Sequence, residues 1–169
     1  MNKLLVGSIA GIVGTYAMTL AKDQMFEQLP KRQRYPLPPR EITQDIIERL
    51  TGRRARDEER LTAATFAAHF GYGALCGATF TALNLHRRRP VLSGLGFGLL
   101  VWADAYLGWL PMSRILTPAS RHPAQRNLVM LASHAVWGAV TGYAATTLMH
   151  AEHAYRTDDR NPSRLRDRR

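Results

Sequence analysis

Three side chains that can do acid–base or metal chemistry lie in apolar surroundings. Asp104 is the only acidic residue between Glu59 and Glu152, and His69 and His134 lie in segments without Asp, Glu, Lys or Arg. An Asp with two His can form a structural hydrogen-bonded network, a proton-coupled site or a metal-binding triad. The spacing matches no H-E-x-x-H pattern, and the three groups come from three separate segments. We therefore predict a polar cluster, with no metal site and no catalytic residue.

We expect this polar cluster to lie at one depth of a helical bundle. Asp104 lies about 10 Å along its helix from the proline that follows it, and His69 and His134 lie similarly far from the starts of theirs. Thr15 and Thr19 of the first apolar segment reach the same level. An opposing indication is that Asp104 lies about 120 degrees around its helix from the glycines of the same segment. That angle favours contact with a partner subunit instead.

The elements that position these residues are long segments without charge. Soluble helices need a charged outer face, so charge-free runs of about 20 residues are typical of membrane spans. The sequence predicts four spans, at about 4–21, 61–85, 91–110 and 127–149. The first could instead be a cleaved signal peptide, but it lacks a clear cleavage site. We predict an all-α integral membrane four-helix bundle over residues 1–154, followed by a disordered basic tail over residues 155–169.

Every predicted span carries two glycines four residues apart, which favours close helix packing in lipid. The pairs are Gly7 with Gly11, Gly73 with Gly77, Gly94 with Gly98, and Gly138 with Gly142. His69 and His134 each precede one of these pairs by four residues. This repetition predicts two tandem helix hairpins of the same orientation. Convergence on one packing rule is the alternative explanation.

The polar segment between the first two spans has a helical pattern of its own. Ile42, Ile46, Ile47 and Leu50 recur at helical spacing and predict a short amphipathic helix over residues 40–51. This helix either caps the bundle or lies in the membrane interface.

The formal net charge of +10 raises the question of nucleic-acid binding. The basic residues flank the apolar segments, as they do in membrane proteins, and we expect no nucleic-acid partner. The compact turn 87–89 is all arginine and predicts that both termini are cytoplasmic. Arg121, His122 and Arg126 precede the last span, where they either bind an anionic head group or form a simple helix-entry loop.

Several segments resemble a known family. They are "AGIVGTYAMTLAKD", "QRYPLPPREIT", "AHFGYGALCGA", "WADAYLGWLP" and "SRHPAQRNLVMLASHAVWGAVTGY". From about residue 6 to residue 145 the chain is similar to the YagU-like family of uncharacterised bacterial inner-membrane proteins. The resemblance implies a multi-span protein of the bacterial inner membrane, and it implies no activity, substrate or site residue.

The function that these patterns favour is an accessory or structural protein of the inner membrane. Its expected partners are membrane lipids and either a second copy of the chain or another membrane protein. A small proton-coupled carrier or channel acting as a homo-oligomer is the alternative, and a membrane-embedded metal-dependent enzyme is a third possibility. No cofactor is expected.

Overall fold

The computed structural model describes residues 2–34, 38–115 and 121–159, and all regular structure in these ranges is helical. The long helices are α1 (Lys3–Glu27), α3 (Glu58–Ala82), α4 (Pro90–Ala103) and α6 (Ala124–Asp159). The shorter elements are the 3-10 turn η1 (Lys31–Gln33), α2 (Pro38–Thr51), the π-helical η2 (Asp104–Trp109) and α5 (Leu110–Met112). The predicted all-α fold class is confirmed.

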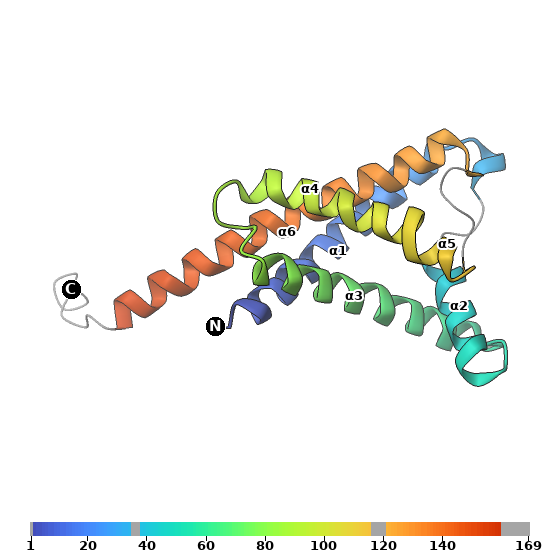
Figure 1. Cartoon of the computed structure of the whole chain (residues 1–169), viewed down its shortest axis with the longest axis horizontal. Coiled ribbons are helices and arrows are strands. Elements are labelled where there is room, and N and C mark those ends of the chain that lie inside the picture. The colour runs from blue at the N-terminus through green and yellow to red at the C-terminus, as the bar shows by residue number, and fades with distance from the viewer. Residues whose placement is uncertain (1, 35–37, 116–120, 160–169) are drawn as a thin grey trace.

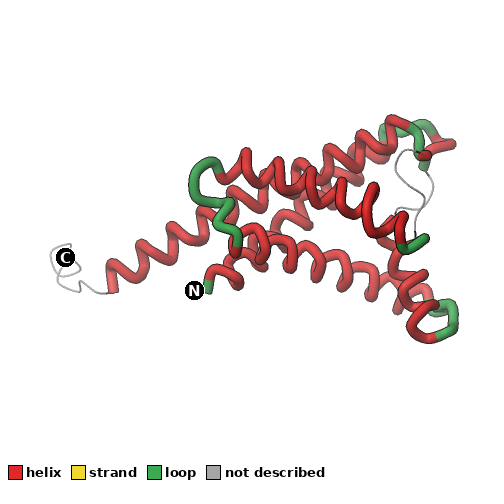
Figure 2. Tube along the Cα trace, viewed as in Figure 1, coloured by secondary structure: helices red, strands yellow, loops and turns green. Residues whose placement is uncertain are grey.

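Among the four long helices, α1 and α6 pack along one another at the centre, with α3 on the outside of α1 and α4 on the outside of α6. α1 packs along α3 and along α6, and α4 packs along α6, whereas α3 and α4 touch only sparsely (Figure 1). The loops gather at the two ends of the bundle (Figure 2). This distribution suits a bilayer, because irregular backbone exposed to lipid would leave polar groups without partners.

Three helices of the described ranges are long and apolar enough to cross a membrane. They are Lys3–Glu27, Pro90–Met112 and Ala124–Tyr155. Their outer faces expose large apolar side chains, among them Leu5 at 51%, Leu100 at 67% and Leu128 at 64%. Such surfaces are a liability in water and favourable in hydrocarbon. These helices and surfaces are consistent with the predicted membrane protein. Although α3 is as long as α1, it is not among the three, because threonine, histidine and glycine dilute its apolar residues.

Glycines bring α1 and α3 into backbone contact. A Cβ atom placed on Gly11 would lie 2.1 Å from the carbonyl oxygen of Gly73, and one placed on Gly77 would lie 2.2 Å from that of Gly7. No side chain fits at these distances. The two helices therefore approach one another as closely as backbones allow, which maximises van der Waals contact.

The contact between α4 and α6 is built in the same way. A Cβ atom on Gly94 would lie 2.1 Å from the carbonyl oxygen of Gly138, and one on Gly98 would lie 2.2 Å from that of His134. At the far end, a Cβ atom on Gly142 would lie 2.0 Å from the carbonyl oxygen of Pro90. The eight glycines singled out from the sequence thus lie in two helix contacts.

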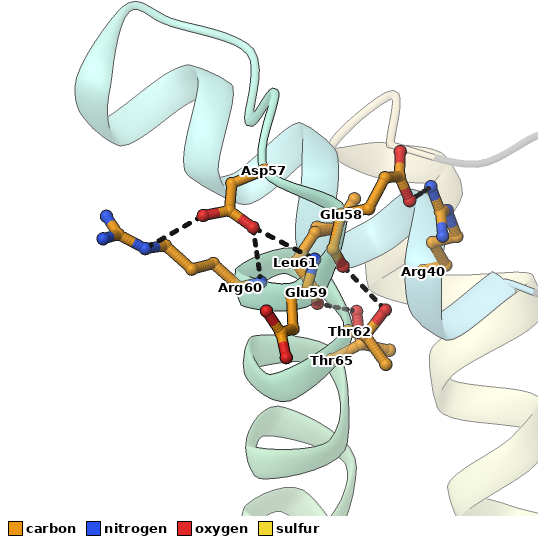
Figure 3. Close-up of polar contacts among 8 residues, drawn as sticks. All are labelled: Arg40, Asp57, Glu58, Glu59, Arg60, Leu61, Thr62 and Thr65. Atoms are coloured by element: carbon orange, nitrogen blue, oxygen red, sulfur yellow. Dashed lines mark hydrogen bonds and ion pairs between the residues drawn. The ribbon is translucent and has the colours of Figure 1, made fainter.

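Polar contacts join α2 to the first turn of α3 (Figure 3). Asp57 is the N-cap of α3, and its carboxylate accepts hydrogen bonds of 3.1 Å from the backbone N–H groups of Glu59 and Arg60. Arg40 of α2 forms an ion pair of 2.5 Å with Glu58. The cap fixes where α3 begins. The ion pair is solvent-exposed and adds only a weak contact between α2 and α3.

Two helix ends differ from the sequence prediction. The third predicted span leaves the α-helical path after Ala103, and the N–H of Leu110 donates to Ala105, five residues earlier. Gly108 has non-helical backbone angles there, and Pro111 follows without an N–H to donate. α6 continues to Asp159, past the predicted span end and into the predicted tail. Residues 160–169 lie outside the described ranges.

Candidate functional site

A cavity of about 250 Å³ lies at the α2 end of the bundle and is called the central cavity below. All four long helices contribute to its wall, together with α2, η2 and α5. Most of its lining is apolar, including Met18, Val101, Ala105, Leu110, Met130 and Trp137. Its volume is slightly below the range typical of drug-sized ligand pockets, so it suits a small or slender molecule.

The amphipathic helix α2 closes one side of the central cavity. Its residues Pro39, Ile42, Thr43 and Ile46 face the cavity, and its charged residues lie on the opposite face. Ile42 and Ile46 of the apolar stripe found in the sequence line the cavity, whereas Leu50 of the same stripe is 81% exposed. The position of Ile42 agrees with the predicted cap over the bundle, and the exposed Leu50 agrees with the predicted contact to the membrane interface.

Trp137 forms the floor of the central cavity and joins α6 to α1. Its side chain is 3% exposed, and its indole N–H is 3.2 Å from both the hydroxyl of Thr15 and the carbonyl oxygen of Gly11. The Thr15 hydroxyl itself donates to the Gly11 carbonyl at 2.8 Å. Because this network is buried and its donors are satisfied, it fixes the relative position of the two helices.

His134 presents an unsatisfied ring nitrogen to the central cavity. The side chain is 8% exposed, and its Nδ1 lies 2.8 Å from the carbonyl oxygen of Met130. A carbonyl oxygen only accepts, so Nδ1 carries the proton and Nε2 has a free lone pair. Nε2 makes no hydrogen bond with the described residues. The ring of Tyr106 meets the imidazole edge-on, with the centroids 5.9 Å apart, and holds its orientation.

His69 lies where the central cavity meets a second, more open hollow of about 360 Å³, called the outer hollow. Lys22 borders both spaces, and its side chain is 14% exposed and lies 3.2 Å from the carboxylate of the neighbouring Asp23. Thr19 lines the outer hollow and donates its hydroxyl proton to the Thr15 carbonyl at 2.8 Å. The outer hollow, which is lined by several polar residues, therefore adjoins the mostly apolar central cavity.

Asp104 does not join the predicted polar cluster. Its side chain is exposed and does not line the central cavity, whereas Thr15, His69 and His134 all do. The physical reason is rotation about the helix axis. The α4 glycines face α6, and Val101 and Ala105 on the adjacent face line the cavity. Asp104 is thereby turned away from α6 and lies on the α3 side, within electrostatic range of Tyr72 and Cys76. The expectation of a buried Asp/His cluster was therefore wrong for the aspartate.

The basic residues before the last predicted span lie within the described residues from 121 onward, and Arg126 among them has a structural role. Arg126 is 3% exposed, donates to the Gln33 carbonyl at 3.1 Å and lies over the ring of Phe26, 6.0 Å from its centroid. It holds the start of α6 against the end of α1. Arg121 is exposed and His122 is half-buried, and neither lines the central cavity.

Several residues of the site were missed by sequence reasoning. Lys22 follows the predicted first span directly, and its position at the end of an apolar run was the available signal. Cys76 lines the central cavity, although a lone cysteine in an apolar helix suggested only packing. The role of Tyr106 depends on the path of the chain through η2, which no sequence pattern indicated.

Comparison of the chain with family models, with curated proteins and with solved structures finds no match in any of the three.

Proposed function

We propose that the protein is a four-span protein of the bacterial inner membrane, built from two tandem helix hairpins, that holds a small and mostly apolar molecule in the central cavity. The observation that carries this proposal is the unsatisfied Nε2 of the buried His134, which faces an apolar chamber. Nε2 makes no hydrogen bond with the described residues and is open to this chamber, so a bound ligand or water would complete its hydrogen bonding. The role is that of an accessory binding protein without catalysis.

The proposed duplication is supported by equivalent backbone contacts. Gly11 meets Gly73 in the first hairpin as Gly94 meets Gly138 in the second, with the same 2.1 Å from Cβ position to carbonyl oxygen. These contacts make Gly94 the equivalent of Gly11. The order of the glycines within each span had instead matched Gly11 with Gly98. α3 then corresponds to α6, and it crosses the membrane in spite of its lower hydropathy.

The proposed orientation places both termini in the cytoplasm. The turn between α3 and α4 carries Arg87, Arg88 and Arg89 and lies at the same bundle end as Lys3. The pKa of His86 in this turn is lowered by burial and, to a smaller extent, by the charges of Arg87 and Lys3. These charges therefore lie close together beside two spans, where the positive-inside rule acts most strongly.

The native thiol offers a direct test of the central cavity. Cys76 is 9% exposed and lies on the cavity wall. We expect a small water-soluble methanethiosulfonate reagent to modify it in the folded protein in bilayers, because the outer hollow gives water a route to the chamber. Mass spectrometry of the intact protein reads the extent of modification.

The matched control is the double variant Cys76→Ser, Leu75→Cys. Leu75 is the neighbouring residue and is 65% exposed on the outer face of α3. A thiol there faces hydrocarbon, where the reactive thiolate does not form, so it should react much more slowly. If Cys76 stays unmodified or reacts no faster than the control, the cavity is closed to solutes and the proposal fails.

Self-association is a second proposed property, and it is supported by Asp104. Its exposed carboxylate lies within a candidate span, on the same helix as the exposed Leu100 and Leu107. A carboxylate facing lipid is costly and is normally covered by protein. We expect Asp104→Ala to lower the dimeric fraction in bilayers, measured by cross-linking, whereas Tyr143→Ala on α6 should not. An unchanged dimeric fraction, or a protein that is monomeric throughout, would exclude this contact.

A further inference from the structure

The central cavity is lined by nitrogen bases and by no acid. Lys22, His69 and His134 come from α1, α3 and α6 and all line this chamber, and Lys22 and His134 are each within electrostatic range of His69. No Asp or Glu among the described residues lines this chamber, and the partner of Lys22, Asp23, is 59% exposed at its edge. Two acids outside the lining lie within electrostatic range of it, Asp104 near Tyr72 and Cys76 and Glu41 near Tyr106. The ionisable nitrogen atoms of the lining itself therefore favour an acidic group over a basic one.

The free lone pair of His134 favours an acid that can form a hydrogen bond with Nε2 in both its protonated and its ionised form. A neutral carboxylic acid donates its O–H to Nε2, and a carboxylate accepts the N–H of the protonated imidazole. The hydrogen bond forms with the proton on either partner. Lys22, which only donates, can serve the other carboxyl oxygen.

The depth of the site matches the polar boundary of the bilayer. Lys22 follows directly after the charge-free segment of α1, and the amphipathic α2 lies at the same end of the bundle. The apolar chamber beyond Lys22 lies at the level of the hydrocarbon. An amphiphile bound with its polar head group at Lys22 and its apolar chain in the chamber would have the same orientation as a lipid in the leaflet, with the head group at the surface and the chain in the hydrocarbon.

From these observations we propose that the central cavity binds a single-chain amphiphile with a carboxylic acid head group, the chemical class of the fatty acids. The volume of about 250 Å³ suits one slender chain. The proposal rests on the binding role proposed above and adds the class of the ligand. Lys22 and His134 recognise the head group, and Trp137 and Met18 contact the chain.

The test measures protection of Cys76 by two ligands of equal chain length. The full-length protein in zwitterionic bilayers is titrated with dodecanoic acid or with dodecan-1-ol before the thiol reagent is added. We expect half-protection by the acid at a concentration at least about tenfold lower than by the alcohol, since a hydrogen bond to a charged group contributes roughly that factor. Equal protection by both compounds would overturn the ligand class and leave the binding role intact. Protection by neither compound, together with an unmodified Cys76, would overturn both.

Matched variants assign the head-group contact. Lys22→Gln should raise the half-protecting concentration of the acid about tenfold and leave that of the alcohol unchanged. Arg32→Gln removes an exposed positive charge from η1 at the same end, outside both hollows, and should change neither value. If Lys22→Gln does not fold, His134→Gln carries the same expectation. If dodecanoic acid still protects better than dodecan-1-ol in both Lys22→Gln and His134→Gln, these two residues do not bind the head group.

Discussion

Replacement of Gly138 by alanine is expected to lower the free energy of unfolding by about 3 kcal/mol, the upper part of the usual range for overpacked sites. The new Cβ atom would lie 2.0 Å from the carbonyl oxygen of Gly94 and 2.7 Å from its carbonyl carbon. Both are backbone atoms of α4, so the clash is relieved only if the two helices separate. Reversible unfolding in mixed micelles, followed by circular dichroism, measures the loss.

The control for this substitution is Gly96→Ala on the same pair of helices. A Cβ atom at Gly96 meets no heavy atom within 4 Å. Alanine should therefore be tolerated there and should stabilise the helix by up to about 1 kcal/mol. Equal losses at both positions would show that the close backbone approach at Gly138 does not explain the loss.

The second large effect is expected at Trp137, where alanine should cost about 3–5 kcal/mol of unfolding free energy. The substitution removes a buried indole from the seam between α1 and α6 and leaves the hydroxyl of Thr15 without its donor. Trp137→Phe keeps most of the volume and should cost about 1 kcal/mol, the value of the lost hydrogen bond. The same unfolding experiment measures both variants.

Tyr143→Ala is the matched control for the tryptophan substitution. Tyr143 is also on α6 and is 65% exposed. Its removal should change the stability by no more than about 0.5 kcal/mol. A loss at Trp137 no larger than this would mean that the seam between α1 and α6 does not hold the bundle together.

The membrane helices could be predicted because they depend on local patterns. Charge-free length and glycine spacing are properties of single segments, and they located α1, α4 and α6 among the candidate spans. The glycines also indicated which helix faces meet. The contacts between Gly11 and Gly73 and between Gly94 and Gly138 follow from the faces that the pairs define.

The site was harder to predict because it depends on rotation and on separation between helices. Asp104 was placed in the polar cluster from its depth along the helix alone. Its angle around the helix already indicated that it lies on a different face from the glycines. The central cavity exists because α3 diverges from α4 and α2 crosses the opening, and no single segment encodes that geometry. His134 was identified by its isolation in an apolar helix. Its bond to the Met130 carbonyl, which frees Nε2, requires the structure.

The sparse contact between α3 and α4 has a mechanical consequence. The glycine contacts make two closely packed helix pairs, α1 with α3 and α4 with α6. The two pairs are joined along the line where α1 packs against α6. Rotation about that line, as on a hinge, moves α3 away from α4 without separating any glycine pair. Such a motion would widen the chamber toward the lipid, and it would have to break the ring contact between Phe80 and Phe97 and strain the bonds of Trp137 to α1. The helix α2, which packs on α3, would move with α3.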